Sequence, residues 1–284
     1  METSRKNELR RLAANVRISI IEEVYHAASG HPGGSLSIAD ILTYLYFEKM
    51  NVDPKNPKME DRDRFVLSKG HTSPALYAVL AEKGFFPKED LVTFRHNGSY
   101  LQGHPDMKGV PGVDMSSGSL GLGISSACGM ALSAKYGKKD YRVYAAIGDG
   151  ESEEGQVWEA AMFAAHYKLD NLCVVLDFNG LQIDGPVAEV IGPAPFDTKF
   201  RAFGWNVIEI NAHDFDEIEA AFKAAEECKG KPTLILAHST KGKGVSYMEN
   251  ACAWHGAAPK TDKYEIAINE LKAELASIEA EIKG

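Results

Sequence analysis

Hydrophobic residues recur at helical spacing near the start of the chain. Between residues 8 and 28 they stand three or four positions apart, which predicts a helix with one apolar stripe: Leu9, Leu12, Val16, Ile20 and Val24. The glycine- and proline-containing run 29–34 should break this helical pattern. Further helices are predicted over 38–49, 74–82 and 88–94, and residues 64–67 have the character of a short apolar strand.

The second half of the chain alternates apolar strands with amphipathic helices. Strands are predicted over 142–147, 171–178, 205–210 and 233–237, and helices between them over 153–166, 197–203 and 214–228. This alternation is typical of the α/β fold class: a doubly wound, mainly parallel sheet with helices on both faces. A charged helix is expected over 262–283. Since no repeat or low-complexity linker divides the chain, residues 1–284 are expected to form a single domain.

Composition excludes several classes of function. The chain has 31 Lys and Arg against 40 Asp and Glu, a net charge of −9, and no stretch concentrates basic residues. Binding to nucleic acid or to a membrane surface through a basic face is therefore not expected. Four widely spaced cysteines without a C-x-x-C pair indicate neither a disulfide framework nor a zinc site. With no apolar leader or membrane-spanning run, we expect a cytoplasmic protein.

Residues 97–123 contrast with the periodic segments around them. Nine of these 27 residues are glycine or proline, and no hydrophobic period runs through them. A long irregular segment inside a compact domain is usually functional or disordered, and the presence of His104 favours a ligand loop. The spacing of Gly118, Gly121 and Gly123 resembles a dinucleotide fingerprint, but no predicted strand precedes it, so NAD binding is rejected.

Two successive strand ends carry oxygen-bearing side chains. Gly148-Asp149-Gly150 follows one predicted strand, and Asn179 follows the next. Ligands of open parallel sheets bind beyond the carboxyl ends of the strands, and flanking glycines let the backbone approach a phosphate. Either motif alone is more simply a turn. Together they predict a magnesium site of a few protein oxygens, completed by phosphate and water.

Four of the nine histidines adjoin a glycine in an irregular segment: His31, His71, His104 and His255. A lone histidine is more often structural than catalytic. Four in glycine-bearing loops favour a functional interpretation, because imidazoles can donate hydrogen bonds to diphosphate or substrate oxygens and can relay protons near pH 7.

Charged residues stand in or near two of the glycine-containing motifs. Lys241 lies in a Lys-Gly-Lys-Gly run that lacks Walker A spacing, so it is either a phosphate contact or a solvated lysine. Glu151 and Glu153 are explained by favourable charge at a helix N-terminus.

The sequence resembles the thiamine-diphosphate enzymes, and within them the transketolase family. Gly-Asp-Gly, Glu154-Gly155 and, some thirty residues on, Asn-Gly fit the superfamily's diphosphate motif. The transketolase resemblance extends from about residue 11 to 259 and rests on five further segments: 29–33, 68–71, 103–105, 117–121 and 254–259.

The resemblance implies roles for individual residues. Magnesium, or Ca²⁺ or Mn²⁺ in its place, would be held by Asp149, Asn179 and the Leu181 carbonyl. His31, His104 and His255 would be catalytic residues of the substrate channel. The implied contacts to thiamine diphosphate are His71, Gly118, Leu120, Gly148, Asp149, Gly150, Glu154, Asn179, Leu181, Lys241 and His255. Glu154, with Glu159, would also lie between the two active sites of a dimer.

The resemblance also implies a partner. In the family, a glutamate on a separate pyrimidine-binding domain activates the cofactor, and this chain matches only the first domain. We therefore expect the N-terminal subunit of a two-chain transketolase of the pentose phosphate pathway, an α2β2 heterotetramer. It would transfer a two-carbon ketol unit between sugar phosphates. The alternatives are the cofactor-binding subunit of a 2-oxo acid dehydrogenase and a non-catalytic scaffold that kept the fold.

Overall fold

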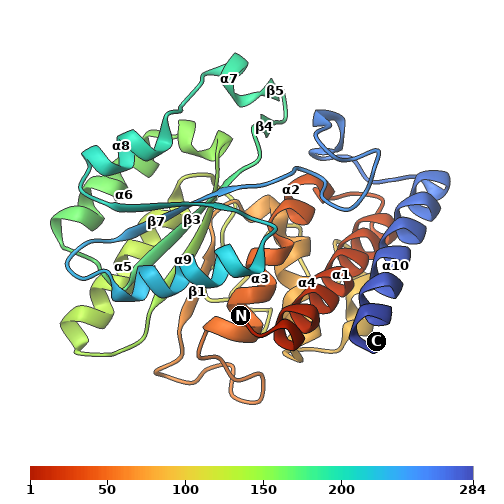
Figure 1. Ribbon diagram of the computed structural model, residues 1–284, viewed down its shortest axis with the longest axis horizontal. Helices are drawn as coiled ribbons and strands as arrows, with labels where there is room; N and C mark the ends of the chain where they lie inside the picture. The colour runs from red at the N-terminus through yellow and green to blue at the C-terminus, as the bar shows by residue number, and fades with distance from the viewer. Residues whose placement is uncertain (284) are drawn as a thin grey trace.

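A five-stranded, fully parallel sheet forms the centre of the molecule in a computed structural model that describes residues 1–283 (Figure 1). The strands lie in the order β1-β2-β3-β7-β6. Their bounds are β1 Arg64–Leu67, β2 Val143–Gly148, β3 Leu172–Phe178, β6 Asn206–Asn211 and β7 Thr233–His238. A separate antiparallel pair joins β4 (Leu181–Gln182) and β5 (Gly185–Pro186). The predicted parallel α/β sheet is confirmed.

Helices cover both faces of the sheet (Figure 1). One face packs against α1 (Thr3–His26), α3 (Ala39–Tyr44), α4 (Ser73–Lys83) and α9 (Phe215–Glu227). The other packs against α5 (Leu122–Gly137), α6 (Gly155–His166) and α8 (Phe196–Ala202). Side chains along β2 alternate accordingly: Tyr144 and Ala146 join the first core, and Val143, Ala145 and Ile147 the second.

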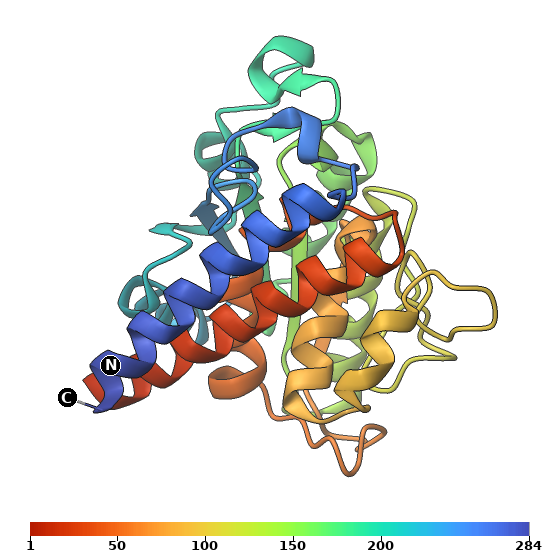
Figure 2. The same ribbon diagram turned by 90° about the vertical axis from the view of Figure 1, so that its right-hand side faces the viewer.

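The last helix, α10 (Thr261–Lys283), packs along α1 on the outside of the first layer (Figure 2). Shorter elements are α2 (Pro32–Ser37), α7 (Val187–Val190), a π-helical turn at Leu45–Lys49, and 3₁₀ turns at Gly70–Thr72, Lys88–Thr93, Gly150–Glu153 and Cys252–Trp254. Across residues 1–283, no helix combines the length and the apolar character that crossing a bilayer requires.

The predicted helix over 88–94 is a 3₁₀ turn, and the predicted helix over 38–49 is α3 followed by a π-helical turn. Two further helices depart from the sequence prediction. α1 ends at His26, ahead of the run 29–34, and α2 begins within that run at Pro32, in the first helical turn where proline is favoured. A Cβ on Gly33 would lie 2.9 Å from the Trp254 carbonyl oxygen, so this glycine permits close packing and does not break the helix. The second is α5, which sequence reasoning missed. Its buried stripe consists mainly of small residues, whose periodicity is weak: Gly123, Ile124, Ala127, Cys128, Ala131 and Ala134.

The carboxyl ends of the strands bring the predicted motifs to one edge of the sheet. β1 leads into Ser68 and Lys69, β2 ends at Gly148, and β3 leads into Asn179. Gly148 pairs with Asp177 across β2 and β3, and Asp177 pairs with Ala237 across β3 and β7. The parallel register therefore aligns three of these strand ends.

Glu23 is a buried acid in α1 with no hydrogen-bond partner for either carboxyl oxygen among residues 1–283. Burial, and then the neighbouring Glu22 carboxylate, raise the pKa of Glu23 well above its usual range. The folded state thus favours the protonated acid, while the unfolded chain ionises at the ordinary pKa. The stability that Glu23 contributes should be complete below that ordinary pKa and be lost as pH rises through the raised pKa.

Glu23→Gln should remove this pH-dependent loss, since glutamine keeps the shape and cannot ionise. At pH 8 we expect the variant to be more stable than the wild type by roughly 1–3 kcal/mol, measured by urea unfolding between pH 5 and 8. Glu265→Gln, which alters an exposed acid of α10, is the matched control. Parallel pH profiles for Glu23→Gln and the wild type would contradict the prediction.

Candidate active site

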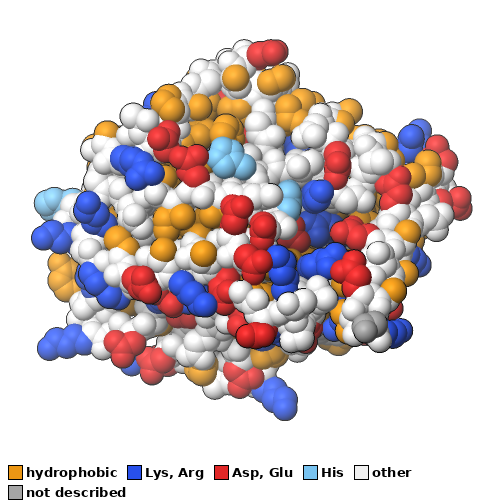
Figure 3. Space-filling view, in the orientation of Figure 1, with side chains coloured by type: hydrophobic (Ala, Val, Ile, Leu, Met, Phe, Trp, Pro, Cys, Tyr) orange, Lys and Arg blue, Asp and Glu red, His pale blue; other side chains and the backbone are white. Residues whose placement is uncertain are grey.

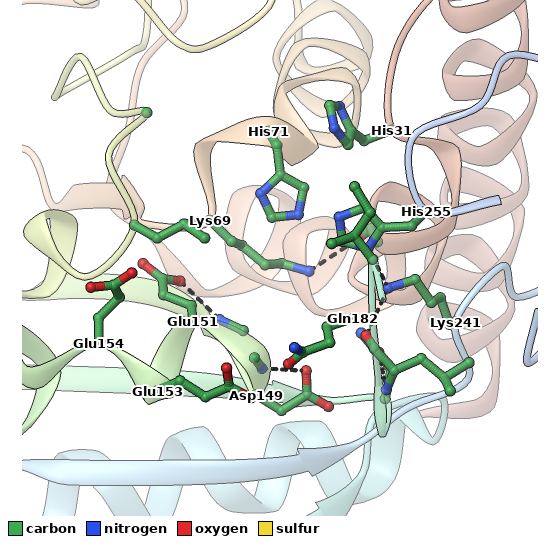
Figure 4. A pocket seen from close by; sticks show the side chains of 18 of the residues that line it. His31, Lys69, His71, Asp149, Glu151, Glu153, Glu154, Gln182, Lys241 and His255 are labelled. Carbon is green, nitrogen blue, oxygen red and sulfur yellow. Dashed lines mark hydrogen bonds between the residues drawn. The ribbon is translucent and has the colours of Figure 1, made fainter. Parts of the chain in front are cut away.

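A cavity of about 400 Å³ opens at the carboxyl edge of the sheet (Figure 4). All residues with a predicted catalytic, cofactor-binding or metal-binding role line it: His31, His71, His104, Gly118, Leu120, Gly148, Asp149, Gly150, Glu154, Asn179, Leu181, Lys241 and His255. Glu159, predicted to lie with Glu154 between two active sites, is not among the lining residues. In Figure 4 the imidazoles of His31, His71 and His255 lie across the cavity from the carboxyl groups of Asp149 and Glu154. The structure therefore brings the predicted set together, and the individual roles remain predictions.

Asp149 is buried at the end of β2 and ties two loops together. Its Oδ1 accepts from the Gly150 amide at 2.8 Å and its Oδ2 from the Gly180 amide at 2.6 Å. Burial, and then the nearby Asp177 carboxylate, raise the pKa of Asp149 to about 6, although the two amides act in the opposite direction. A cation at this carboxylate would offset both the burial and the repulsion.

The other two predicted metal ligands follow β3: Asn179 lies in the loop and Leu181 begins β4. The Asn179 amide nitrogen donates to Asp177 Oδ2 at 3.2 Å. The nitrogen end of this side chain therefore faces Asp177. The Leu181 carbonyl accepts from the Lys241 ammonium at 2.8 Å and so already faces a cationic group. A carboxylate, an amide oxygen and a carbonyl are hard oxygen donors, so these residues fit a magnesium ion.

No cluster of three or more His, Cys, Asp or Glu suited to a metal occurs within residues 1–283. The proposed donor set contains only one such residue, Asp149.

The histidines form a compact group of neutral rings. The ring centroid of His71 lies 5.1 Å from that of His31 and 5.2 Å from that of His255. Burial, followed by neighbouring cations and rings, lowers the pKa of His31 to about 4, that of His255 to about 3 and that of His71 well below its usual range. Burial and then Arg95 lower the pKa of His104. Each neutral ring has one donor nitrogen and one acceptor nitrogen.

Lys241 is buried, so the alternative of a solvated lysine is wrong. Its Nζ lies 2.8 Å from His255 Nδ1. Burial lowers the pKa of Lys241 to about 8, with Asp149 acting against the shift, and the ammonium form still predominates near pH 7. The ammonium donates, so His255 Nδ1 accepts and the ring proton resides on Nε2.

Sequence reasoning missed a buried ion pair beneath the cavity. Lys69 forms a salt bridge with Asp177 and donates to the Gly34 carbonyl at 3.0 Å. Ser37 and Ser239 also donate to Asp177. Burial disfavours the Asp177 carboxylate, but these partners, above all Lys69, hold its pKa below the usual value. The segment 68–71 was noted for its histidine, and nothing in the sequence pairs its lysine with Asp177.

Glu151 also has a different environment from the one expected. It is buried, not exposed at a helix N-terminus, and accepts from the Ser68 hydroxyl and from the amides of Gly121 at 2.9 Å and Gly148 at 3.0 Å. Burial raises its pKa, and these three donors oppose the shift. Glu151 therefore joins the end of β1, the loop that contains Gly118 and Gly121, and the end of β2. Gly34, Glu153, Gln182 and Ile183 are further lining residues outside the predicted set.

A doubly wound sheet with oxygen donors, imidazoles and ammonium groups at its carboxyl edge has the architecture of a diphosphate-binding α/β domain. The family model described as "Transketolase, thiamine diphosphate binding domain" matches residues 9–277. The chain belongs to the transketolase family, and its domain is of the thiamine-diphosphate-binding type.

Two bacterial proteins are similar over nearly their whole length, and both are named as subunits of a transketolase. The apulose-4-phosphate transketolase protein of Phocaeicola vulgatus is 44% identical over 94% of this chain and 95% of its own length. The 6-deoxy-6-sulfo-D-fructose transketolase protein of a Clostridium species is 46% identical over 94% of this chain and 97% of its own. The likeness to transketolase subunits of two-chain enzymes predicted from the sequence is thus confirmed.

Solved structures of longer chains share the fold. The transketolase of Leishmania mexicana superimposes with a TM-score of 0.85 and 30% identity, covering 97% of this chain and 45% of that one. The transketolase of Campylobacter jejuni gives 0.83 and 32%, covering 96% and 48%. The chain therefore spans about half the length of these structures.

Proposed function

We propose that this chain is the diphosphate- and magnesium-binding subunit of a two-chain transketolase and transfers a two-carbon ketol unit together with a partner chain. The observation that carries the proposal is the convergence of Asp149, Asn179, Leu181 and the histidine group on one cavity. Bound thiamine diphosphate would supply the carbanion chemistry. The chain's own residues would bind, orient and protect it.

Each group of lining residues would have a separate task. Asp149, Asn179 and the Leu181 carbonyl would hold the cation. Lys241 and His255 would meet diphosphate oxygens, because an ammonium and an imidazole N–H are both donors there. His31 and His104 would hold or move protons on substrate oxygens, as neutral rings can, since burial lowers the pKa of both.

The partner would cover an apolar rim around the cavity. Leu120 and Ile183 line the cavity and are exposed. Ile191, just after α7, is also exposed. Figure 3 shows hydrophobic side chains gathered over the β4–α7 segment, at the top of the view. Exposed apolar surface beside an incomplete site is typical of a protein interface. The α2β2 assembly and a cytoplasmic location are parts of this proposal.

Ile191→Lys should weaken association with the partner chain at least ten-fold, because a charge would replace one of the most exposed apolar side chains of the rim. Sedimentation of an equimolar mixture with the chain carrying the pyrimidine-binding domain measures this. Tyr136→Lys is the matched control, since Tyr136 is equally exposed but lies near the other end of α5. Equal weakening by both variants would contradict the assignment of this rim.

The substrates would be ketoses and aldoses with a terminal anionic group. The two bacterial relatives are named for a sugar phosphate and a sulfonated sugar.

A direct test incubates both chains, thiamine diphosphate and Mg²⁺ with ribose 5-phosphate and one of four donors: xylulose 5-phosphate, fructose 6-phosphate, apulose 4-phosphate or 6-deoxy-6-sulfofructose. Ketol transfer with any donor, absent without the partner, supports the proposal. Turnover of pyruvate or branched 2-oxo acids would favour the dehydrogenase alternative, and no magnesium-dependent cofactor binding would favour the scaffold.

A further inference from the structure

His213 lies just beyond β6, outside the residues that line the cavity. Its Nδ1 is 2.7 Å from Asp40 Oδ2, and its Nε2 accepts from the Thr240 amide at 2.9 Å. The ring thus joins α3, which carries Asp40, to the loop after β7.

The direction of these two hydrogen bonds is fixed by a buried ion pair. Arg17 of α1 donates to Asp40 through both terminal nitrogens, at 3.0 and 2.5 Å. Burial disfavours the Asp40 carboxylate, but Arg17 and His213 hold its pKa well below the usual range. An ionised carboxylate only accepts, so Nδ1 of His213 carries the proton and Nε2 is left as the acceptor for Thr240.

Thr240 directly precedes Lys241, and the loop is held on the other side as well. The Gly242 amide donates to the Gly33 carbonyl at 2.9 Å, and the Lys241 carbonyl accepts from the Asn250 amide at 2.9 Å. From this backbone the Lys241 side chain reaches the Leu181 carbonyl and His255. A continuous series of contacts therefore extends from Arg17 to the cavity.

We propose that His213 is a positioning residue that, with Arg17 and Asp40, fixes the backbone at Thr240 so that the Lys241 ammonium is held inside the cavity. A water molecule could satisfy the Thr240 amide, but it would leave the loop free to shift. A ring attached to a buried ion pair restricts both the direction and the distance of this contact. That this position of Lys241 serves diphosphate binding rests on the proposed function. The position of Lys241 itself does not depend on it.

Competitive labelling of amines with acetic anhydride, read by mass spectrometry, tests the placement without any cofactor. In the wild type, Lys241 should react slowly because it is 2% exposed, whereas the neighbouring Lys243 should react freely. In His213→Ala we expect Lys241 to react about ten-fold faster, with Lys243 unchanged. Lys69, also 2% exposed, reports on general loosening and should stay slow. His213→Gln should restore slow labelling, since its amide offers both a donor and an acceptor.

The inference is overturned if His213→Ala leaves Lys241 as slow as in the wild type. It is also overturned if Lys69 accelerates equally and His213→Gln labels like the alanine variant, which would show a general structural role. His238→Ala, which alters an exposed histidine at the end of β7, is the control.

In a second experiment, the affinity of the two-chain complex for thiamine diphosphate is measured. If labelling changes but affinity does not, the placement stands and the proposed diphosphate contact of Lys241 is refuted.

Discussion

Replacing Asp149 by alanine should lower ketol transfer by the two-chain enzyme about a thousand-fold, a loss of about 4 kcal/mol of transition-state stabilisation. The substitution removes the only carboxylate of the proposed magnesium site. It also removes the acceptor for the Gly150 and Gly180 amides, which place the loops after β2 and β3. Calorimetric titration with thiamine diphosphate, with and without Mg²⁺, should show that metal-dependent binding is lost.

A matched control separates the loss of a metal ligand from the mere loss of a negative charge. Asp140 is an exposed acid in the loop before β2, at the opposite end of that strand from Asp149, so Asp140→Ala removes a negative charge away from the cavity and from the proposed partner interface. It should retain cofactor binding and at least half the activity. Magnesium-dependent binding by Asp149→Ala equal to that of the wild type would exclude Asp149 as the metal ligand.

The parts of the site that could be predicted are those whose signal is local in the sequence. Gly148-Asp149-Gly150 and Asn179 stand directly after apolar strands, and parallel pairing of β2 with β3 was enough to bring them together. The histidines were conspicuous because each adjoins a glycine. In both cases one short segment carries the residue type and its structural context.

The missed features depend on contacts between distant segments. Lys69 and Asp177 are 108 positions apart, and His213 and Asp40 are 173 apart, so no spacing rule pairs them. Glu151 was interpreted from its place near a helix start, whereas it is buried against Ser68, which follows β1, and against the loop that contains Gly121. Tertiary packing decides such environments, and single-sequence periodicity contains no information about it.

The buried pair between Lys69 and Asp177 supplies the second large effect. Lys69→Met should destabilise the chain by about 3–5 kcal/mol, because it leaves a buried carboxylate without its cationic partner. Urea unfolding at pH 7.5 measures the change. Lys88→Met, which breaks the more exposed pair with Glu82, is the control and should cost less than about 1 kcal/mol.

The double variant Lys69→Met, Asp177→Asn separates the charge from the shape of this site. Asparagine removes the uncompensated charge and retains an acceptor for Ser37 or Ser239, so the double variant should regain at least half of the lost stability. Its magnesium-dependent cofactor binding should nevertheless stay weak, because Asp177 also holds the amide nitrogen of Asn179. The double variant would thus regain stability without regaining magnesium-dependent cofactor binding. If the double variant is as unstable as Lys69→Met alone, the loss arises from packing of the lysine stem, and the buried charge is not its cause.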